Sequence, residues 1–584
     1  MRLSKNEKVL EKSQISKTET VLKHVLKNAY EFGKVNSKVV LGMVLRESEE
    51  LRKKVPEVLK EIEKIVKEVE KLSKKEVEKQ IQKISPDLLK DKGRKEKEKE
   101  GKLKPLPNAE KGKVVLRIAP SPSGPLHIGH AYGASLNYEY AKMYKGKFIV
   151  RIEDTNPENI YEPAYKLIEE DAKWLTDNHV DKIVIQSSRL GIYYDYAEKL
   201  VNIEKAYVCE CDSDEWREMK SKGKACPCRK LSKKENQIRY AKMFTSYKEG
   251  EAVLRLKTDI KHKNPAMRDF PIMRINEQIH PKTKKENRVW PLMVLSVAID
   301  DHELGITHVL NGKDHADNAK KETIIMEYLG WKAPEYKHWG RINFEGFKLS
   351  TSDTKVSIEQ GEFSGWDDIR LATLMALRKR GYQSGAFRKY STEIGLSLND
   401  KTVSQTEFWK NIDTFNREIV ESKANRYFFV DNPSKKTIEG VSRKEASVDL
   451  HPDFPKRGKR KFKLGKEFYL AKTDLKNLVK GKIHRLMDAF NFEIEKGKFK
   501  FVSENYEDYK NSKKKGIIIH WLPADSKLKV EVVHPDKDKT TDKGFGESSM
   551  NNLKEGDIVQ LERRYFARLI EKEKNKLIFW YLHK

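Results

Sequence analysis

The part of the sequence that says most about the fold is the stretch Arg117-Ile118-Ala119-Pro120-Ser121-Pro122-Ser123-Gly124-Pro125-Leu126-His127-Ile128-Gly129-His130. It follows the apolar run Val114-Val115-Leu116, which predicts a buried parallel strand, and precedes residues 131–144, which predict a helix. Pro, Ser and Gly between them predict a tight turn, so the free N–H groups at the helix start face a crevice that can bind an anion. His127 and His130 would line this crevice and donate hydrogen bonds to phosphate oxygens. Gly129 would let a flat ring approach the backbone.

Length and composition bound the alternatives. A chain of 584 residues is too long for one core and predicts three or four domains. The 118 Lys+Arg against 89 Asp+Glu give a net charge of +29, which favours a polyanionic partner, although a merely soluble, charge-rich surface also fits. No apolar run reaches the ~20 residues of a membrane span, and the amino terminus lacks a signal-peptide apolar region. We therefore expect a cytoplasmic protein that binds no membrane.

The first ninety residues show helical periodicity. Between positions 18 and 89, apolar residues recur at spacings of three and four residues, and Pro56 fits the first turn of a helix. We expect a domain of three or four helices with no catalytic constellation, which could dock RNA, dock a protein or only stabilise the chain. Residues 91–104 are nearly all charged and predict a solvated linker.

A second polar group follows the next strand. Lys147-Phe148-Ile149-Val150-Arg151-Ile152 ends in Glu153-Asp154-Thr155, which places carboxylates at the carboxyl edge of the sheet, where open α/β sheets bind ligands. Taken alone, Asp154 could equally cap a helix.

The four cysteines form two close pairs, Cys209/Cys211 and Cys226/Cys228, on either side of a charged helical stretch. Four thiolates satisfy tetrahedral zinc, and a closed four-sulfur site is structural rather than catalytic. The alternative is free reduced cysteines in a loop. Their position between residues 209 and 228 argues against a secreted disulfide scaffold.

Three polar strings mark the second half of the core. Asp300-Asp301-His302 follows an apolar run and could be a metal cluster or a cap. Asn311-Gly312-Lys313-Asp314-His315 ends the strand predicted over residues 306–310. Phe347-Lys348-Leu349-Ser350-Thr351-Ser352 follows a short strand over residues 341–344 and in isolation predicts a polar surface turn.

From about residue 430 the period changes to that of short strands, which predicts one or two β-barrels. Lysines and arginines interleave with aromatics, most densely at residues 455–461. Such strips suit single-stranded RNA, because bases stack on rings while phosphates meet cations. A solvated basic face is the alternative.

These motifs together resemble the class I aminoacyl-tRNA synthetases, in their glutamyl/glutaminyl branch. The first stretch resembles the branch's Arg-x-Ala-Pro-Ser-Pro-Ser-Gly and His-Ile-Gly-His, and residues 151–157 resemble its second hallmark. Residues 347–352 resemble the Lys-x-Ser-Lys-Ser loop. His451-Pro452-Asp453-Phe454-Pro455 and the terminal Tyr581-Leu582-His583-Lys584 resemble the β-barrel anticodon domain of the archaeal-type glutamyl enzymes. The resemblance covers residues 18–584.

The resemblance implies a multidomain fold that combines α/β and all-β parts around a Rossmann-type catalytic core. The expected divisions are a helical domain over 1–90, a linker over 91–110, the first Rossmann half over 111–204, an inserted acceptor-end-binding domain with the zinc site over 205–288, the second half over 289–370, a helical connector over 371–425 and a β-barrel anticodon-binding domain over 426–584.

The function implied by the resemblance is that of a glutamate–tRNA ligase. L-glutamate would attack Mg²⁺-bound ATP to give glutamyl-adenylate, and the acyl group would pass to the terminal adenosine of tRNA(Glu), with tRNA(Gln) an open alternative. Arg117 would pair with the side-chain carboxylate of glutamate and Glu153 would accept its ammonium group. A monomer is expected.

The resemblance also implies three groups of site residues. The catalytic group is His127, Gly129, His130, Lys348, Ser350 and Ser352. The substrate-binding group is Arg117, Ala119, Ser121, Glu153 and Asp154. The ATP-binding group is Pro120, Gly124, Asp314, His315 and Lys355.

Two positions depart from the family pattern. Asn311 stands where relatives carry arginine, and Thr351 replaces the second lysine of the loop, as in archaeal-type enzymes; Lys355 could supply the missing charge. Three other functions compete with a glutamate–tRNA ligase. They are a glutaminyl-tRNA ligase, an RNA-binding protein with a decayed active site, and a truncated tRNA-modifying paralogue, which the long β-rich tail disfavours.

Overall fold

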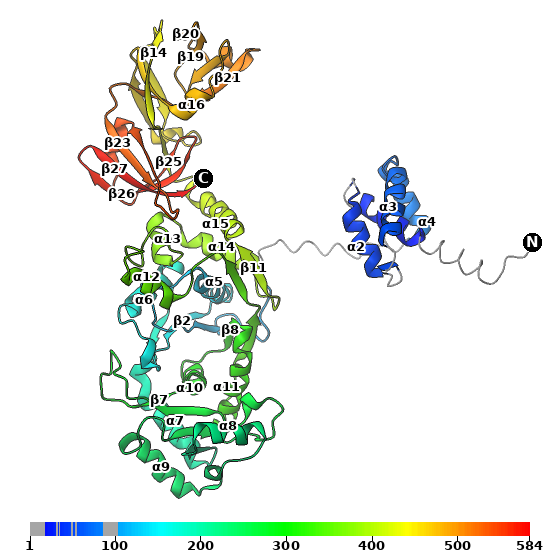
Figure 1. Ribbon diagram of the computed structural model, residues 1–584, viewed down its shortest axis with the longest axis vertical. Helices are drawn as coiled ribbons and strands as arrows, with labels where there is room; N and C mark the ends of the chain where they lie inside the picture. The colour runs from blue at the N-terminus through cyan, green and yellow to red at the C-terminus, as the bar shows by residue number, and fades with distance from the viewer. Residues whose placement is uncertain (1–17, 31–32, 34, 48–50, 53–54, 86–102) are drawn as a thin grey trace, which may run out of the picture. The chain divides into compact units, whose positions relative to one another are not determined.

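The computed structural model describes residues 18–85 and 103–584, apart from 31–32, 34, 48–50 and 53–54 (Figure 1). The chain divides into two units, Met1–Glu100 and Gly101–Lys584. Most of the charged linker expected over residues 91–104 lies outside the described residues. Among the residues described, no helix combines the length and apolar character that a membrane span needs.

The first unit is helical, as its periodicity predicts. Residues 18–30 form a helix, followed by α2 (Ser37–Glu47), α3 (Val55–Val69) and α4 (Lys74–Ile84). Pro56 lies in the first turn of α3, where its missing N–H costs no hydrogen bond. Ser73 and Glu76 form a reciprocal capping box at the start of α4. The apolar faces of these helices build one small core of their own.

The second unit begins with a parallel sheet. Strands β1 (Val115–Ile118), β2 (Lys147–Ile152) and β3 (Lys182–Ile185) pair in parallel, as do β8 (His308–Gly312) and β9 (Glu335–Trp339). The Thr307 amide donates to the Val115 carbonyl at 3.1 Å, which places the start of β8 beside β1. The carboxyl ends of β1, β2 and β8 therefore meet at one edge, where the expected site residues lie.

Helices cover this sheet and continue into a helical connector. In chain order they are α5 (Ile128–Met143), α6 (Ala164–Leu175), α7 (Leu190–Asn202), α10 (Met293–Glu303), α11 (Ala316–Leu329), α12 (Thr351–Glu359), α13 (Leu374–Arg380), α14 (Ser384–Ile394) and α15 (Gln405–Val420). Strands β10 (Ile342–Glu345) and β11 (Lys401–Ser404) pair in parallel beside them. The core beneath these helices is continuous from Leu106 to Leu582.

An antiparallel sheet is inserted in the chain between the two halves of the core. It consists of β4 (Ala206–Cys209), β5 (Val253–Leu256), β6 (Pro271–Ile275) and β7 (Val289–Pro291), with α8 (Ser213–Ser221) and α9 (Lys233–Thr245) between β4 and β5. Trp290 is fully buried in its core. This part lies at the end of the second unit opposite the all-β part (Figure 1).

Strands are the main regular elements of the last 160 residues, as predicted. One seven-stranded sheet has the order β12-β25-β26-β27-β23-β24-β13. Its two outermost strands, β12 (Asn425–Tyr427) and β13 (Phe429–Asp431), are joined through Phe428 alone, so the sheet curls round to near closure as a barrel. The other strands of this sheet are β23 (Leu528–Val533), β24 (Thr541–Gly546), β25 (Ile558–Leu561), β26 (Tyr565–Glu573) and β27 (Lys576–His583).

A second seven-stranded sheet has the order β21-β18-β19-β20-β14-β17-β22. Its strands are β14 (Pro433–Glu439), β17 (Glu467–Ala471), β18 (Ile483–Leu486), β19 (Asn491–Glu495), β20 (Lys498–Ser503), β21 (Lys515–Ile519) and β22 (Leu522–Pro523), and β15 (Glu445–Asp449) pairs with β16 (Lys459–Lys463) as a separate hairpin. Short helices α16 (Lys472–Lys476) and α17 (Tyr506–Asn511) connect strands. The expectation of one or two barrels is thus met by two sheets, one of them nearly closed.

Candidate active site

The signature turn between β1 and α5 fixes both histidines by their backbone. His127 is the N-cap of α5, and its Nδ1 accepts the Gly129 amide at 3.1 Å. The Nδ1 of His130 accepts the His127 amide at 3.3 Å. Because each Nδ1 is an acceptor, the proton of each neutral ring is on Nε2. The two rings lie against one another with centroids 3.9 Å apart.

Both imidazoles are held in the neutral form. Burial and the neighbouring His130 lower the pKa of His127 to about 2. Desolvation in the crevice lowers the pKa of His130 as well, although its ring remains in contact with solvent. At neutral pH the pair therefore offers two N–H donors rather than two cations.

The turn itself is anchored from two sides. The Leu126 amide donates to Oδ2 of buried Asp171 on α6 at 3.1 Å, and the Leu126 carbonyl accepts the Leu374 amide at 2.8 Å. Burial raises the pKa of Asp171 to about 7. Sequence reasoning missed Asp171; a single acidic residue on the buried face of an amphipathic helix was the available signal.

Two glycines allow close approaches. A Cβ on Gly129 would lie 2.9 Å from Cε1 of His127, so the flat ring that this glycine admits is the imidazole two residues before it. A Cβ on Gly124 would lie 2.4 Å from Cγ2 of Thr351. The first signature turn and the Lys348–Ser352 loop are therefore in contact, and Gly124 makes that contact possible.

Arg117, at the end of β1, is bound by an acidic residue of the protein. Its Nε and Nη2 donate to Oδ1 and Oδ2 of Asp301 on α10 at 3.1 and 2.9 Å. Both side chains are buried. Of its guanidinium nitrogens, only Nη1 has no hydrogen-bond partner among the residues that the structure describes.

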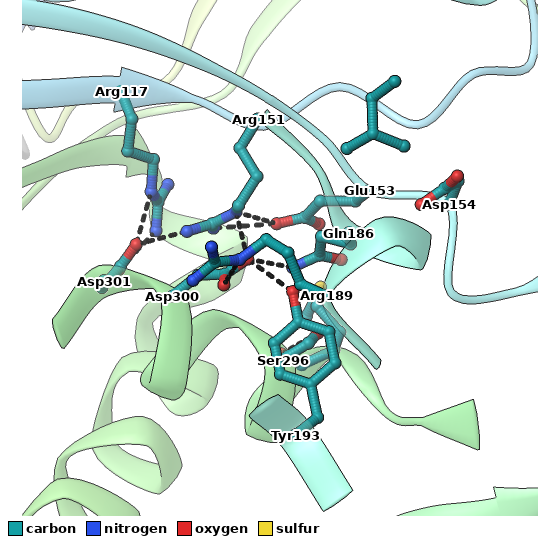
Figure 2. A network of polar contacts seen from close by, with 12 residues as sticks. Arg117, Arg151, Glu153, Asp154, Gln186, Arg189, Tyr193, Ser296, Asp300 and Asp301 are labelled. Atoms are coloured by element: carbon teal, nitrogen blue, oxygen red, sulfur yellow. Dashed lines mark hydrogen bonds and ion pairs between the residues drawn. The ribbon is translucent and has the colours of Figure 1, made fainter. Parts of the chain in front are cut away.

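Arg151, inside β2, joins this pair to Glu153 (Figure 2). Its Nη1 donates to Asp301 at 2.5 Å, and its Nη2 donates to Oε1 of Glu153 at 2.9 Å. Burial by itself disfavours both charges, but the adjacent carboxylates raise the pKa of Arg151 and the two arginines lower the pKa of Asp301, so these groups are charged.

Asp300, next to Asp301 on α10, faces a different set of partners (Figure 2). It accepts hydrogen bonds from Gln186, Arg189 and Tyr193 at 3.1, 2.7 and 2.8 Å. The two adjacent aspartates thus point in different directions, and neither of them caps a helix. The missed signal was the occurrence of two adjacent aspartates directly after the apolar part of a helix and of two arginines in apolar strands.

The side chain of Asp154 is occupied by hydrogen bonds from other residues of the protein. It is fully buried, and it accepts the Tyr165 hydroxyl at 2.6 Å and the amide and hydroxyl of Ser187 at 2.7 Å each. The Nε2 of His280, from the inserted sheet's loop, lies 3.0 Å from its carbonyl. Asp154 thereby fastens the inserted part to the end of β2.

The remaining residues of the first turn shape the backbone. The Pro120 carbonyl accepts the Glu153 amide at 3.0 Å, and the Ser121 carbonyl accepts the Ser123 amide at 2.9 Å. Ala119 lies beside them, directly after β1. These contacts bring the turn and the end of β2 together, as the sequence predicts.

The second loop leads into α12. Ser350 is the N-cap of that helix and its Oγ accepts the Asp353 amide, while Ser352 lies in the first turn. Lys348 is exposed, with its Nζ 3.4 Å from Glu362. Lys355 pairs with Glu359 at 3.9 Å and lies over the ring of Tyr161, whose amide donates to the Pro122 carbonyl of the first turn.

The loop after β8 lies at the same sheet edge. Nδ1–H of His338 donates to Oδ1 of Asn311 at 2.6 Å, and Lys313 pairs with Asp400 at 2.7 Å. Asp314 and His315, both in the short turn Lys313–His315, are 3.5 Å apart. At the position where the family pattern has arginine, this chain thus has a neutral amide that is hydrogen-bonded to a histidine.

The cysteines converge, as their spacing predicts. All four Sγ atoms lie within 4.8 Å of one another, with Cys209 and Cys226 3.9 Å apart and Cys211 and Cys228 3.7 Å apart. Four sulfurs at 2.3 Å from one tetrahedral zinc would be about 3.8 Å from each other. Arg239 donates to Sγ of Cys228 at 3.4 Å.

Three family models match the chain. Residues 113–422 match "tRNA synthetases class I (E and Q), catalytic domain", and residues 424–510 and 518–570 each match "tRNA synthetases class I (E and Q), anti-codon binding domain". The chain belongs to this family. It is 46% identical over 575 residues to a glutamate–tRNA ligase of Pyrococcus furiosus, which covers 96% of this chain and 99% of the relative.

Two further glutamate–tRNA ligases match over similar lengths. The one from Thermococcus kodakarensis is 44% identical (97% of this chain, 99% of the relative), and the one from Methanocaldococcus jannaschii is 42% identical (97% and 100%). These relatives confirm the predicted fold, the class I synthetase family and the expected glutamate–tRNA ligase. Nothing among them favours the glutaminyl alternative.

Proposed function

We propose that the sheet edge formed by β1, β2 and β8 activates L-glutamate with ATP, and that the enzyme then transfers the glutamyl group to tRNA(Glu). The observation that carries this is the pairing of the two-histidine turn with Arg117 and Glu153 at one edge of the sheet. Nη1 of Arg117 and Oε2 of Glu153 have no partner among the described residues. These atoms would bind the side-chain carboxylate and the ammonium group of glutamate.

The side chains that would bind the phosphates are two neutral imidazole N–H donors and one lysine. The Nε2–H groups of His127 and His130 donate to phosphate oxygens of the Mg²⁺–ATP substrate, and Lys348 moves from Glu362 to the charge that develops as pyrophosphate leaves. The first turn of α12 adds backbone N–H groups, with Ser352 and Lys355 beside it. Gly124, Pro120, Asp314 and His315 shape the nucleotide side of the site.

No side chain acts as a covalent nucleophile. The glutamate carboxylate attacks the α-phosphate, and pyrophosphate is the leaving group. The 2′-hydroxyl of the terminal adenosine of tRNA then attacks the activated carbonyl and AMP leaves. The protein contributes positioning and electrostatic stabilisation.

The four cysteines would hold a structural zinc ion. Their mutual distances match a tetrahedral S₄ site, and three of the four are buried. A closed site of this kind fixes the turn before α9 against β4 and leaves no open position for a substrate.

Aminoacylation of purified tRNA(Glu) and tRNA(Gln) with labelled glutamate, and separately with glutamine, tests the function. Glutamate on tRNA(Glu) is the expected result, and glutamate on tRNA(Gln) as well would define a non-discriminating enzyme. Acceptance of glutamine alone would overturn the substrate assignment. The monomeric state and the cytoplasmic location stay predictions from the sequence.

A further inference from the structure

We infer that Arg151 and Asp301 act as a buried spacer that sets the distance between Arg117 and Glu153, and that this spacer makes the enzyme select its amino acid by length. The inference rests on the proposed function, in which Arg117 and Glu153 bind the two charged ends of glutamate. Arg151 and Asp301 are then positioning residues and not ligands of the substrate.

The four side chains form one continuous row (Figure 2). Asp301 accepts from Arg117 through both of its oxygens and from Nη1 of Arg151 through Oδ1. The other edge of the Arg151 guanidinium, Nε and Nη2, donates to Oε1 of Glu153 at 3.3 and 2.9 Å. The row therefore starts at the carboxylate-binding residue and ends at the ammonium-binding residue.

Exposure separates the middle of this row from its ends. The side chains of Arg151 and Asp301 are 0% exposed, whereas those of Arg117 and Glu153 are 6% and 14% exposed. A substrate in the crevice can reach only the ends. The atoms left open there are one nitrogen and one oxygen of opposite charge, which suits a zwitterion with a second carboxylate.

The spacer is stiff because its groups are planar and held on more than one side. A guanidinium bound along two edges cannot rotate without breaking a charged hydrogen bond in a buried site. Asp300 does not hold the spacer in this way, since its Oδ2 lies 3.9 Å from Nε of Arg151, which is beyond hydrogen-bond distance. The distance between the two open atoms is thus fixed before the substrate arrives.

A fixed distance distinguishes acidic amino acids by chain length. Aspartate is one methylene shorter than glutamate, so it cannot satisfy both ends at once. A single methylene is worth about 10- to 200-fold in kcat/KM, and the penalty rises when a charged group is left without its partner. The spacer therefore favours glutamate over aspartate by at least that factor.

The experiment compares two neighbouring aspartates. Asp301→Asn removes the charge that holds Arg117, whereas Asp300→Asn removes an equally buried charge that contacts Gln186, Arg189 and Tyr193 but not Arg117. Glutamate- and aspartate-dependent ATP–pyrophosphate exchange is measured for both variants and the wild type. Thermal unfolding of each variant reports its folding.

For Asp301→Asn we expect the KM for glutamate to rise at least 10-fold, the KM for ATP to stay within about 2-fold, and the glutamate-to-aspartate ratio of kcat/KM to fall at least 10-fold. Asp300→Asn should lose stability but keep that ratio within about 3-fold of wild type. An unchanged glutamate-to-aspartate ratio in Asp301→Asn, or an equal fall of this ratio in both variants, would overturn the inference that Arg151 and Asp301 set the distance.

Asp301→Glu covers the case in which Asp301→Asn does not fold. It keeps the charge and lengthens the row by one methylene, so the same fall in the ratio is expected, and an unchanged ratio counts against the inference. A wild-type enzyme that activates no glutamate would instead defeat the proposed function, which keeps the two failures distinguishable.

Discussion

Replacing His127 by Asn separates its two roles in the signature turn. In the structure Nδ1 accepts the Gly129 amide at 3.1 Å and Nε2–H is the free donor. The Oδ1 of Asn can take over the first role, because Asn is among the best N-cap residues. Its side chain is too short to replace the Nε2–H donor. The variant should therefore fold normally and lose only the phosphate contact.

The magnitude follows from the charge state of the ring. Its pKa of about 2 makes His127 a neutral donor, and His130 remains beside it. Loss of one such donor to a developing oxyanion costs about 100- to 1,000-fold in kcat. With a neutral donor and a second one in place, we expect the lower end, about 100-fold.

The assay is ATP–pyrophosphate exchange at saturating glutamate and ATP, with thermal unfolding as the control for folding. His127→Gln is the matched variant, since its amide nitrogen can approach the Nε2 position while the cap is lost. It should be about 1 kcal/mol less stable than His127→Asn but faster. The reasoning is refuted if His127→Asn keeps its rate within threefold of wild type, or if the Gln variant is the slower one.

Three other perturbations have defined outcomes. Cys226→Ser should abolish zinc binding, seen by elemental analysis of the purified enzyme, and should lower the unfolding temperature; one zinc per chain in the variant would contradict the site. Gly124→Ala would place its Cβ 2.4 Å from Thr351, so the two loops must separate, and we expect the KM for ATP to rise while that for glutamate changes little. Burial and Asp301 raise the pKa of Glu322 from 4.5 to about 7. Between these two pH values the folded protein keeps a proton on Glu322 that the unfolded chain has lost. Ionisation of Glu322 therefore lowers the free energy of unfolding, by nothing below pH 4.5 and by its full amount above pH 7. Glu322→Gln should therefore match wild-type stability near pH 4.5 and exceed it by on the order of 3 kcal/mol at pH 8 in urea unfolding, and a difference that does not vary with pH would contradict this.

The sequence predicts the elements that carry strong local signals. The Pro, Ser and Gly residues between β1 and α5 predict the tight turn there. The spacing of the four cysteines alone predicts that their sulfur atoms lie close together. The change from helical to strand periodicity near residue 430 likewise predicts the all-β part. In each case the information lies within a few neighbouring residues.

Contacts between distant segments could not be predicted in the same way. Asp301 is 184 residues from Arg117, and no local pattern indicates which aspartate a strand arginine will bind. The sequence therefore predicts Arg117 as a free substrate ligand, whereas the structure shows it already bound on one side. Asp171 and His280 were missed for the same reason, since each acts on the backbone or side chain of a segment far away in the chain.

The row of buried charges also constrains the order in which the catalytic part can fold on the ribosome. Arg117 and Arg151 are made 184 and 150 residues before Asp301. At 5 to 20 residues per second the nascent chain waits about 10 to 40 s for that carboxylate. A guanidinium buried without its partner is strongly destabilising, so β1 and β2 cannot complete their packing during this interval. The inserted sheet and its cysteines leave the ribosome in the meantime, and the core closes around a part of the chain that has already been synthesised.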